Sequence, residues 1–380
     1  MKTGAFVVDL QALDRVRVSP ETRIAEVEGG ARVQSVTEVS SRLGLLAACG
    51  TNPGTGFVGA ALSGGYGWLT RTFGYAVDNV VGAEVVLPNG DRVLAEEEGE
   101  HADLLWGLRG GGGNFGVVTR LFIRLHPAPP TLIAGRLIHF APSAAAKAKA
   151  LRAFDKLMTE APSGLTGTVV LTSSMFIHTL WCYIGEAKSV SEVSCLLAAQ
   201  GLGGLAVVRN TLKKRSNFDD VQRLLLPFQR TCHRFDSVVP IGTANELLPE
   251  DFVLSIVDKF SKALEPHVRW ANLIMFSVGG DCATKDDGVN TCLTEDFRNS
   301  RYFAIIGTTW DLDSGNHGKE AARKFCKDIK EICSAVKTIQ TTYSCNDLED
   351  DPIKPDSVEL AEDNSVDCND EDPMVKNDLK

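Results

Sequence analysis

Short apolar runs separated by turn residues dominate the first 126 positions of the chain. Three of these runs are predicted strands: Gly4–Leu10, Arg23–Glu28 and Ala83–Leu87. The PNGD sequence at 88–91 predicts a tight turn that folds the last of them back as a hairpin. Apolar positions recur with helical spacing over Val33–Leu43, and Gly44 is suited to end that helix.

The prolines of the PAPP sequence at 127–130 interrupt this pattern, because consecutive prolines continue neither a ladder nor a helix. Strand and helix periods alternate after them. The predicted strands are Leu132–Phe140, Gly167–Ser173, Met175–Gly185, Leu205–Asn210, Trp270–Val278 and Tyr302–Trp310, and the predicted helices are Ala144–Met158, Val190–Gln200, Pro249–Leu264 and Gly318–Ala335. This order predicts an antiparallel sheet covered by helices, an α+β architecture.

Charge divides the chain unevenly. The chain is 44% hydrophobic and carries a net charge of −10. Positions 346–380 contain thirteen acidic residues and three lysines, which leaves the rest near neutral. We therefore expect two domains, at 1–127 and 131–345, and an acidic, disordered tail at 346–380. An interaction tail is one interpretation, and a solvated or misread terminus is the one that composition favours.

Several classes of function find no support in the composition. The chain has no basic patch for a nucleic acid and no apolar stretch long enough to cross a membrane. The ten cysteines are scattered, so metal-ligand spacing is absent, and free thiols or a Cys282–Cys292 disulfide both remain open. The compartment and the oligomeric state are not predicted.

Two glycine-rich runs about fifty residues apart carry the main chemical signal, GTNPGTGFVGAALSGGYGWLTRTFGYAVDN from Gly50 and LRGGGGNFGVVT from Leu108. Glycine lets a ligand approach the main chain, and successive N–H groups in such turns bind anions. Gly54, Gly56 and Gly59 also spell a Rossmann fingerprint, but Pro53 and the glycines at 64, 65 and 67 break the strand and helix it needs. Two anion sites in one domain predict a long cofactor that carries a diphosphate.

The order and spacing of several sequences around these runs resemble the berberine-bridge-enzyme-like FAD-linked oxidases of the vanillyl-alcohol-oxidase superfamily. The matching sequences are VVDL, VEGGA, GGYGWLTRTFGYAVDN, VVLPNGDRV, LLWGLRGGGGNFGVVT and FIRLHP, and a weaker likeness continues through FRNSRYFAIIGTTW to about Tyr343. The resemblance implies a PCMH-type FAD-binding domain, here partial, and a substrate domain.

The chain departs from that family at three places. Family members carry an upstream lobe that ends in R-x-G-G-H, whose histidine often bonds to the flavin, and this sequence starts downstream of that point. Asn52 stands where many members have the cysteine of a second flavin bond, and Cys49 lies three residues too early. The family's closing segment is not recognisable after Tyr343. We therefore expect FAD to be bound without a covalent bond, if it is bound.

The resemblance also implies which residues contact the cofactor: Gly50, Thr51, Gly56, Gly59, Gly64, Gly65, Gly67, Asp78, Asn79, Gly116 and Val118. Asp78 and Asn79 could equally serve as turn or helix caps. Tyr343 falls where the family's catalytic base is found, and a surface tyrosine is the alternative. No metal ligand is expected.

The implied activity is oxidation of a small alcohol, sugar or secondary metabolite, with a hydride passing to flavin N5 and dioxygen as the reoxidant. The partners would then be a small-molecule substrate and dioxygen. The alternative is a truncated or non-catalytic relative that cannot hold FAD, because a missing pyrophosphate loop would remove several hydrogen bonds.

Overall fold

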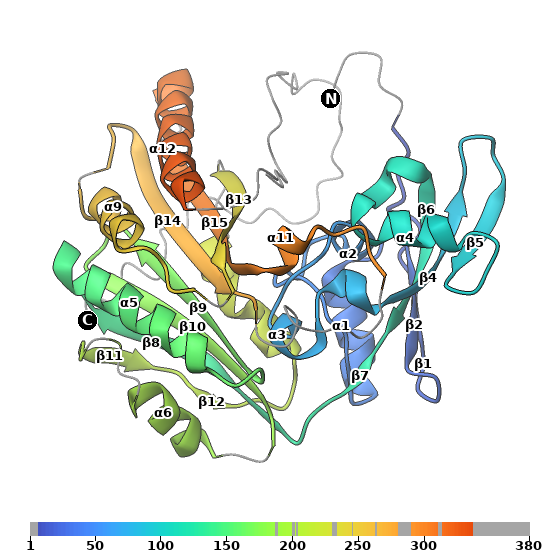
Figure 1. Ribbon diagram of the computed structural model, residues 1–380, viewed down its shortest axis with the longest axis horizontal. Coiled ribbons are helices and arrows are strands. Elements are labelled where there is room, and N and C mark those ends of the chain that lie inside the picture. Colours follow the sequence, from blue (N-terminus) through green and yellow to red (C-terminus); the bar gives the residue numbers. More distant parts are fainter. Residues whose placement is uncertain are drawn as a thin grey trace.

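The computed structural model describes residues 7–186, 189–199, 202, 204–229, 234–244, 246–262, 264–279, 290–310 and 314–336. The expected catalytic Tyr343 and the acidic tail at 346–380 lie outside these residues. A smaller sheet and a larger sheet, both antiparallel, lie next to each other (Figure 1). Among the described residues, no helix combines the length and the apolar character that crossing a membrane requires.

The smaller sheet has the strand order β1-β2-β6-β4-β5. Its strands are β1 (Val16–Ser19), β2 (Ile24–Glu28), β4 (Val80–Val86), β5 (Arg92–Glu96) and β6 (Val117–Arg124), and β3 (Leu45–Leu46) pairs separately with β7 (His126–Pro127). The helical elements of this half are α1 (Val33–Arg42), α2 (Phe57–Leu62), α3 (Thr70–Phe73), η1 (Ala76–Asn79), α4 (Ala102–Gly111) and η2 (Gly112–Phe115). The hairpin predicted around PNGD is present as β4 and β5.

The expected strand at Gly4–Leu10 is wrong for the residues that the structure describes. Positions 7–10 form no ladder, and the side chains of Val7 and Val8 are 58% and 53% exposed. The edge beside β2 is taken by β1, which pairs with it from Val16 opposite Val27 to Ser19 opposite Ile24. An apolar, β-branched run becomes a strand only where a partner strand is free to receive its hydrogen bonds.

The larger sheet has the order β11-β8-β10-β9-β14-β15-β13. Its strands are β8 (Thr131–Phe140), β9 (Leu165–Thr172), β10 (Phe176–Gly185), β11 (Val207–Asn210), β12 (Lys213–Lys214), β13 (Arg234–Thr243), β14 (Val268–Ser277) and β15 (Ser300–Trp310). The helical elements are α5 (Ala144–Glu160), α6 (Val190–Ala199), α7 (Asp219–Gln222), η3 (Arg223–Leu225), α8 (Leu226–Gln229), α9 (Glu250–Ser261), α11 (Glu295–Arg298) and α12 (Gly315–Ala335).

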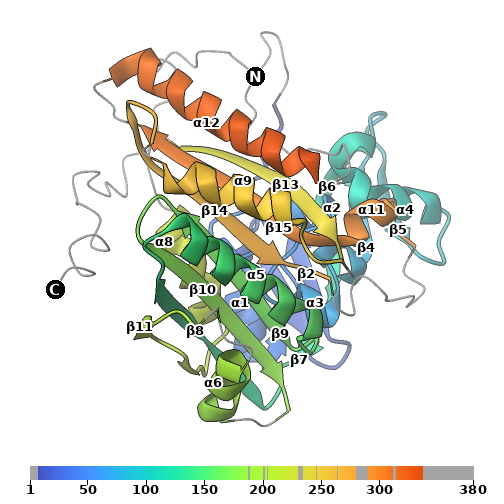
Figure 2. The same cartoon turned by 60° about the vertical axis from the view of Figure 1, so that its left-hand side comes forward.

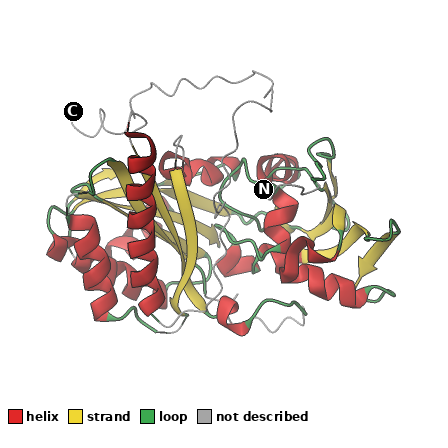
Figure 3. Ribbon diagram, turned by 90° about the horizontal axis from the view of Figure 1, so that it is seen from above, coloured by secondary structure: helices red, strands yellow, loops and turns green. Residues whose placement is uncertain are grey.

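The long helices α5, α9 and α12 lie on the face of the larger sheet that points away from the smaller one (Figures 2 and 3). They bury alternate residues of the strands, such as Leu171, Trp181 and Ile306, in one apolar core. This arrangement confirms the α+β fold class predicted from the sequence. The smaller sheet buries its own core against α1, α2 and α4.

A third apolar core, which we call the shared core, lies between the first glycine run and the inner face of the larger sheet. It joins Leu46, Trp68 and Tyr75 of the first glycine run's half to residues on the inner face of the larger sheet, including Leu180 and Phe276. The Trp68 ring meets the Phe276 ring edge-on at 5.2 Å, and Tyr66 stacks on Phe303 at 4.4 Å. Tyr66, Trp68 and Tyr75 of the first run therefore pack against the larger sheet rather than lying on the surface.

Candidate functional site

The first glycine run leaves β3 and folds against the start of α1. Phe57 N–H donates to Ala31 O at 2.8 Å, and Val33 N–H donates to Thr55 O at 2.9 Å. The Asn52 side chain accepts a hydrogen bond from Gly54 N–H at 2.9 Å, which closes a turn. These bonds hold the main chain between residues 52 and 57 in a fixed path that continues into α2.

The glycines of both runs divide into two groups by what a Cβ atom would contact. At Gly50, Gly56, Gly59 and Gly113 a Cβ would meet no atom within 4 Å, so the main chain there faces open space. Gly54 and Gly112 are nearly as open, with one side-chain atom each at 3.5 and 3.7 Å. This backbone surface fits a ligand that binds to main-chain groups, as a flavin dinucleotide does.

The other glycines are closed by the protein itself. A Cβ at Gly65 would lie 2.7 Å from Ala76 Cβ, one at Gly67 would lie 1.9 Å from Cys49 O, and one at Gly116 would lie 2.6 Å from Val86 O. Gly64 faces the Phe297 ring at 3.0 Å. These positions need glycine for packing, a role that the sequence does not separate from contact with a cofactor. Val118 and Thr51 are also buried, at 5% and 6% exposure.

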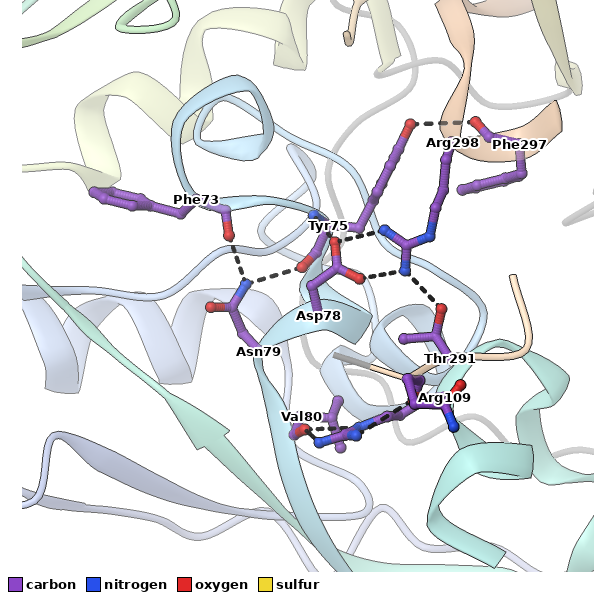
Figure 4. Close-up of polar contacts among 10 residues, drawn as sticks. Phe73, Tyr75, Asp78, Asn79, Val80, Arg109, Thr291, Phe297 and Arg298 are labelled. Atoms are coloured by element: carbon purple, nitrogen blue, oxygen red, sulfur yellow. Dashed lines mark hydrogen bonds and ion pairs between the residues drawn. The ribbon is translucent and has the colours of Figure 1, made fainter. Parts of the chain in front are cut away.

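Asp78 and Asn79 form hydrogen bonds that hold the end of the first run (Figure 4). Asp78 Oδ2 accepts from Tyr75 N–H at 2.9 Å, and Asp78 Oδ1 pairs with Arg298 Nη2 at 2.6 Å. Asn79 Nδ2 donates to Tyr75 O at 2.9 Å and to Phe73 O at 3.1 Å. Of the two roles open for this pair, capping is the one that these bonds support.

Cys49, which precedes the first run, is a buried thiol. Gln222 Nε2 donates to its Sγ at 3.2 Å, and burial raises the pKa of Cys49 to about 12. Because the thiolate is the nucleophile, a thiol held in this way is poorly suited to attack a flavin ring. This observation supports the expectation that Cys49 does not replace the cysteine missing at position 52.

A segment at 290–298, which ends in α11, crosses from the larger half onto both glycine runs; we call it the crossing segment. Cys292 N–H donates to Arg109 O at 2.9 Å, and a Cβ at Gly110 would lie 3.0 Å from Cys292 Sγ. At the other end, Tyr75 Oη donates to Phe297 O at 3.3 Å. The crossing segment therefore contacts the second run at its start and the first run at its end.

Arg109 and Arg298 were not singled out from the sequence. Arg109 is 3% exposed and donates through Nε to Val80 O at 2.9 Å and through Nη2 to Glu97 Oε1 at 2.6 Å. Arg298 also donates to Thr291 Oγ1 at 2.6 Å. The FRNSRYF sequence was part of the family likeness, but the burial of Asp78, which calls for a cation nearby, is seen only in the structure.

Several aromatic and histidine side chains of the larger sheet lie away from the runs. Trp181 belongs to the core beneath the long helices. His178 is 5% exposed and packs edge-on against Phe228 at 5.1 Å, while His139 Nε2 lies 3.2 Å from Thr179 Oγ1. Both histidines are interior residues of the sheet. Within the described ranges no group of three or more His, Cys, Asp or Glu side chains could hold a metal ion.

Comparison with known proteins agrees with this geometry. Residues 1–95 match the FAD binding domain family. The chain is 36% identical over 140 residues to (R)-6-hydroxynicotine oxidase of Paenarthrobacter nicotinovorans, covering 37% of this chain and 30% of the relative. It is 42% identical over 130 residues to xylooligosaccharide oxidase of Thermothelomyces thermophilus, covering 34% and 26%. The matched regions thus span less than a third of these two relatives.

The fold also matches solved structures over a longer range. A berberine bridge enzyme variant superimposes with a TM-score of 0.72 at 21% identity, covering 88% of this chain and 67% of that one. A berberine-bridge-enzyme-like protein of Arabidopsis thaliana gives 0.72 at 20%, covering 89% and 70%. The chain therefore has the fold of an FAD-dependent oxidase and carries its FAD-binding domain. It shares this fold with the berberine-bridge-enzyme-like proteins that the sequence resembles, and the match at residues 1–95 confirms FAD as the cofactor expected from the sequence.

Proposed function

We propose that this chain acts as an FAD-linked oxidoreductase that oxidises a small alcohol, sugar or secondary metabolite, with dioxygen as the reoxidant. The observation that carries the proposal is the set of open glycines at 50, 56, 59 and 113, where the main chain can be approached. Relatives named for oxidising hydroxynicotine and xylooligosaccharides support a small-molecule substrate. FAD would supply the hydride acceptor.

The chain's own contribution is to hold the cofactor against the inner face of the larger sheet. The open glycines would receive FAD through main-chain N–H groups, since no side chain there blocks the approach. The shared core, with Trp68 against Phe276, would keep this surface at a fixed distance from the sheet. Tyr343 remains our proposal for the base, from its place in the sequence.

The test is flavin binding by variants at open positions. Gly56 has φ −61° and ψ 120°, which a branched residue can adopt, so Gly56→Val and Gly59→Val should fold and bind FAD at least tenfold more weakly. Binding is measured from the quenching of flavin fluorescence, and folding from circular dichroism. Gly90→Val is unsuitable as a control because its φ is +92°, whereas Ser216→Val in an exposed loop is suitable.

Two results would contradict the proposal. A folded wild-type protein that binds no FAD would favour the non-catalytic alternative, and full affinity in both glycine variants would move the site elsewhere. The mode of attachment is tested in the same preparation. Because Asn52 cannot form a bond to the flavin and Cys49 is a buried thiol, acid denaturation should release all of the flavin from the chain.

A further inference from the structure

An ion pair with Asp78 attaches the crossing segment to the smaller half, beside the neutral hydrogen bonds at Cys292 and Phe297. Arg298 donates to both carboxylate oxygens of Asp78, at 2.6 and 3.2 Å, and to Thr291 Oγ1 at 2.6 Å (Figure 4). The Asp78 side chain is 8% exposed and that of Arg298 is 21% exposed. A bidentate pair with so little exposure has a defined geometry, unlike an ion pair on the surface.

The same segment reaches both glycine runs from one side. Phe297 covers Gly64, with its ring 3.0 Å from where a Cβ would lie, and Leu293 and Cys292 cover Gly110 at 3.0 Å. Gly64 has φ +107° and Gly110 has φ +122°. Each run therefore presents a glycine in a conformation unfavourable to other residues, at the place where the crossing segment lies against it.

The covered glycines and the open glycines belong to the same two runs. Gly56 and Gly59 lie just before Gly64, and Gly113 follows Gly110 by three residues. A segment that holds position 64 and position 110 thus limits how far apart the open surfaces of the two runs can move. A ligand that must contact both surfaces binds more tightly when their separation is already set.

We propose that Asp78 and Arg298 are positioning residues that fix the crossing segment across both glycine runs and so set the spacing of the FAD-binding surface. This inference rests on the proposed function, because FAD is the ligand that would use both surfaces. The ion pair acts through the segment and not by contact with the cofactor, since its oxygens and nitrogens are engaged with each other, with Tyr75 and with Thr291.

The first readout needs no cofactor. Cys292 is partly buried, and its Sγ lies 3.4 Å from Gly107 O, so its alkylation rate reports whether the segment stays in place. Asp78→Asn keeps an acceptor for Tyr75 N–H but removes the negative charge. Arg298→Gln removes the guanidinium group that donates to both carboxylate oxygens. We expect each to increase the alkylation rate of Cys292 in the reduced protein at least tenfold, measured on the peptide by mass spectrometry.

The second readout is the dissociation constant for FAD, measured by flavin fluorescence. We expect each variant to bind FAD at least tenfold more weakly, and the double variant to bind no more weakly than the worse single one, because either change releases the same segment. Arg298→Lys should restore part of the affinity. Asp328→Asn, which breaks the 2.7 Å pair with Lys259 between α9 and α12, is the matched control and should change neither readout.

The two measurements distinguish a failure of the positioning role from a failure of FAD binding itself. Unchanged alkylation in both variants would overturn it, as would FAD affinity equal to or tighter than that of the wild type despite faster alkylation. Additive losses in the double variant would also overturn it. If the wild type binds no FAD, the proposed function fails and the positioning role fails with it, while the alkylation rates still show whether Asp78 and Arg298 hold the segment.

Discussion

The carboxylate of Asp155, on α5, is shared by three donors beneath the larger sheet. Its Oδ1 accepts from Arg301 Nε at 2.6 Å and from Tyr302 Oη at 2.7 Å, and its Oδ2 accepts from Leu248 N–H at 2.7 Å. Burial is the largest cause that raises the pKa of Tyr302 well above its usual value, so this hydroxyl stays a donor. This one side chain therefore links α5 to β15 and to Leu248, which lies two residues before α9.

We expect Asp155→Asn to lower the free energy of unfolding by about 3–5 kcal/mol, because Arg301 would be left as a buried, unpaired charge. Arg152→Gln on the same helix is the control, since its pair with Glu250 is exposed and should contribute no more than about 1 kcal/mol. Urea unfolding at pH 7 measures both. An equal decrease in the free energy of unfolding in the two variants would show that the Asp155 contacts contribute no more than an exposed ion pair.

The two interior histidines give the sheet a sensitivity to acid. Burial lowers the pKa of His178 to about 3 and that of His139 to about 4, from 6.5. Between pH 6.5 and 4 the unfolded chain therefore binds protons that the folded chain does not, so stability is complete above pH 6.5 and falls as the pH falls. Each histidine contributes a slope of about 1.4 kcal/mol per pH unit in that window.

We expect His178→Phe to remove one of these slopes, so that the variant loses less stability than the wild type between pH 6.5 and 4. The phenyl ring keeps the edge-on packing with Phe228. The measurement is the free energy of unfolding at several pH values, with His317→Gln on the exposed side of α12 as control. A variant whose stability depends on pH as steeply as the wild type would refute the assignment.

The turns of the glycine runs leave no room for a side chain at several positions. Gly65 has φ +66° and a Cβ there would lie 2.7 Å from Ala76 Cβ, while a Cβ at Gly116 would meet Val86 O at 2.6 Å. We expect Gly65→Ala and Gly116→Ala to lower the melting temperature by several degrees, because strain of about 1–3 kcal/mol has no route to relax. Gly59→Ala, in open space on α2, should not lower the melting temperature, because alanine favours a helix more than glycine does.

The glycine pattern alone suggests that all of these glycines contact the cofactor, whereas several of them pack against other segments of the chain. The sequence does not separate glycines that face a ligand from glycines that face another segment, because both need the same absence of a side chain. The partners that close Gly64 and Gly116 come from residues 297 and 86. Substitution at these closed positions should therefore damage folding together with any loss of flavin.

Elements with a strong local period were predicted almost to the residue. Positions 175–185 were expected as a strand and form β10 from Phe176, and the helix expected from Pro249 is α9, starting at Glu250. The strand β13 was not predicted. It contains Pro240, and it lies at the edge of the sheet, where proline is tolerated. The pairing of Asp78 with Arg298 has no local signal at all.

The shared core joins the first glycine run, and through it the smaller half, to the larger sheet, so we expect the two halves to unfold together. Phe276, on the inner face of β14, is fully buried and packs against Trp68. We expect Phe276→Ala to lower stability by about 3–5 kcal/mol and to increase amide exchange in β6 and β14 by the same factor. Phe260→Ala, within the core under α9, should affect β14 first. Protection of β6 that is unchanged in Phe276→Ala would show that the halves unfold separately.

The contact between Asp78 and Arg298 also has a consequence for synthesis of the chain. The two residues are 220 positions apart, so at roughly 5–20 residues per second the ribosome makes the carboxylate about 11–44 s before its guanidinium. Until residues 290–298 are made, Gly64 and, once it is translated, Gly110 lack the segment that covers them, and the Tyr75 hydroxyl lacks the Phe297 carbonyl. The two glycine runs therefore cannot reach their final packing during synthesis until residues 290–298 have been translated.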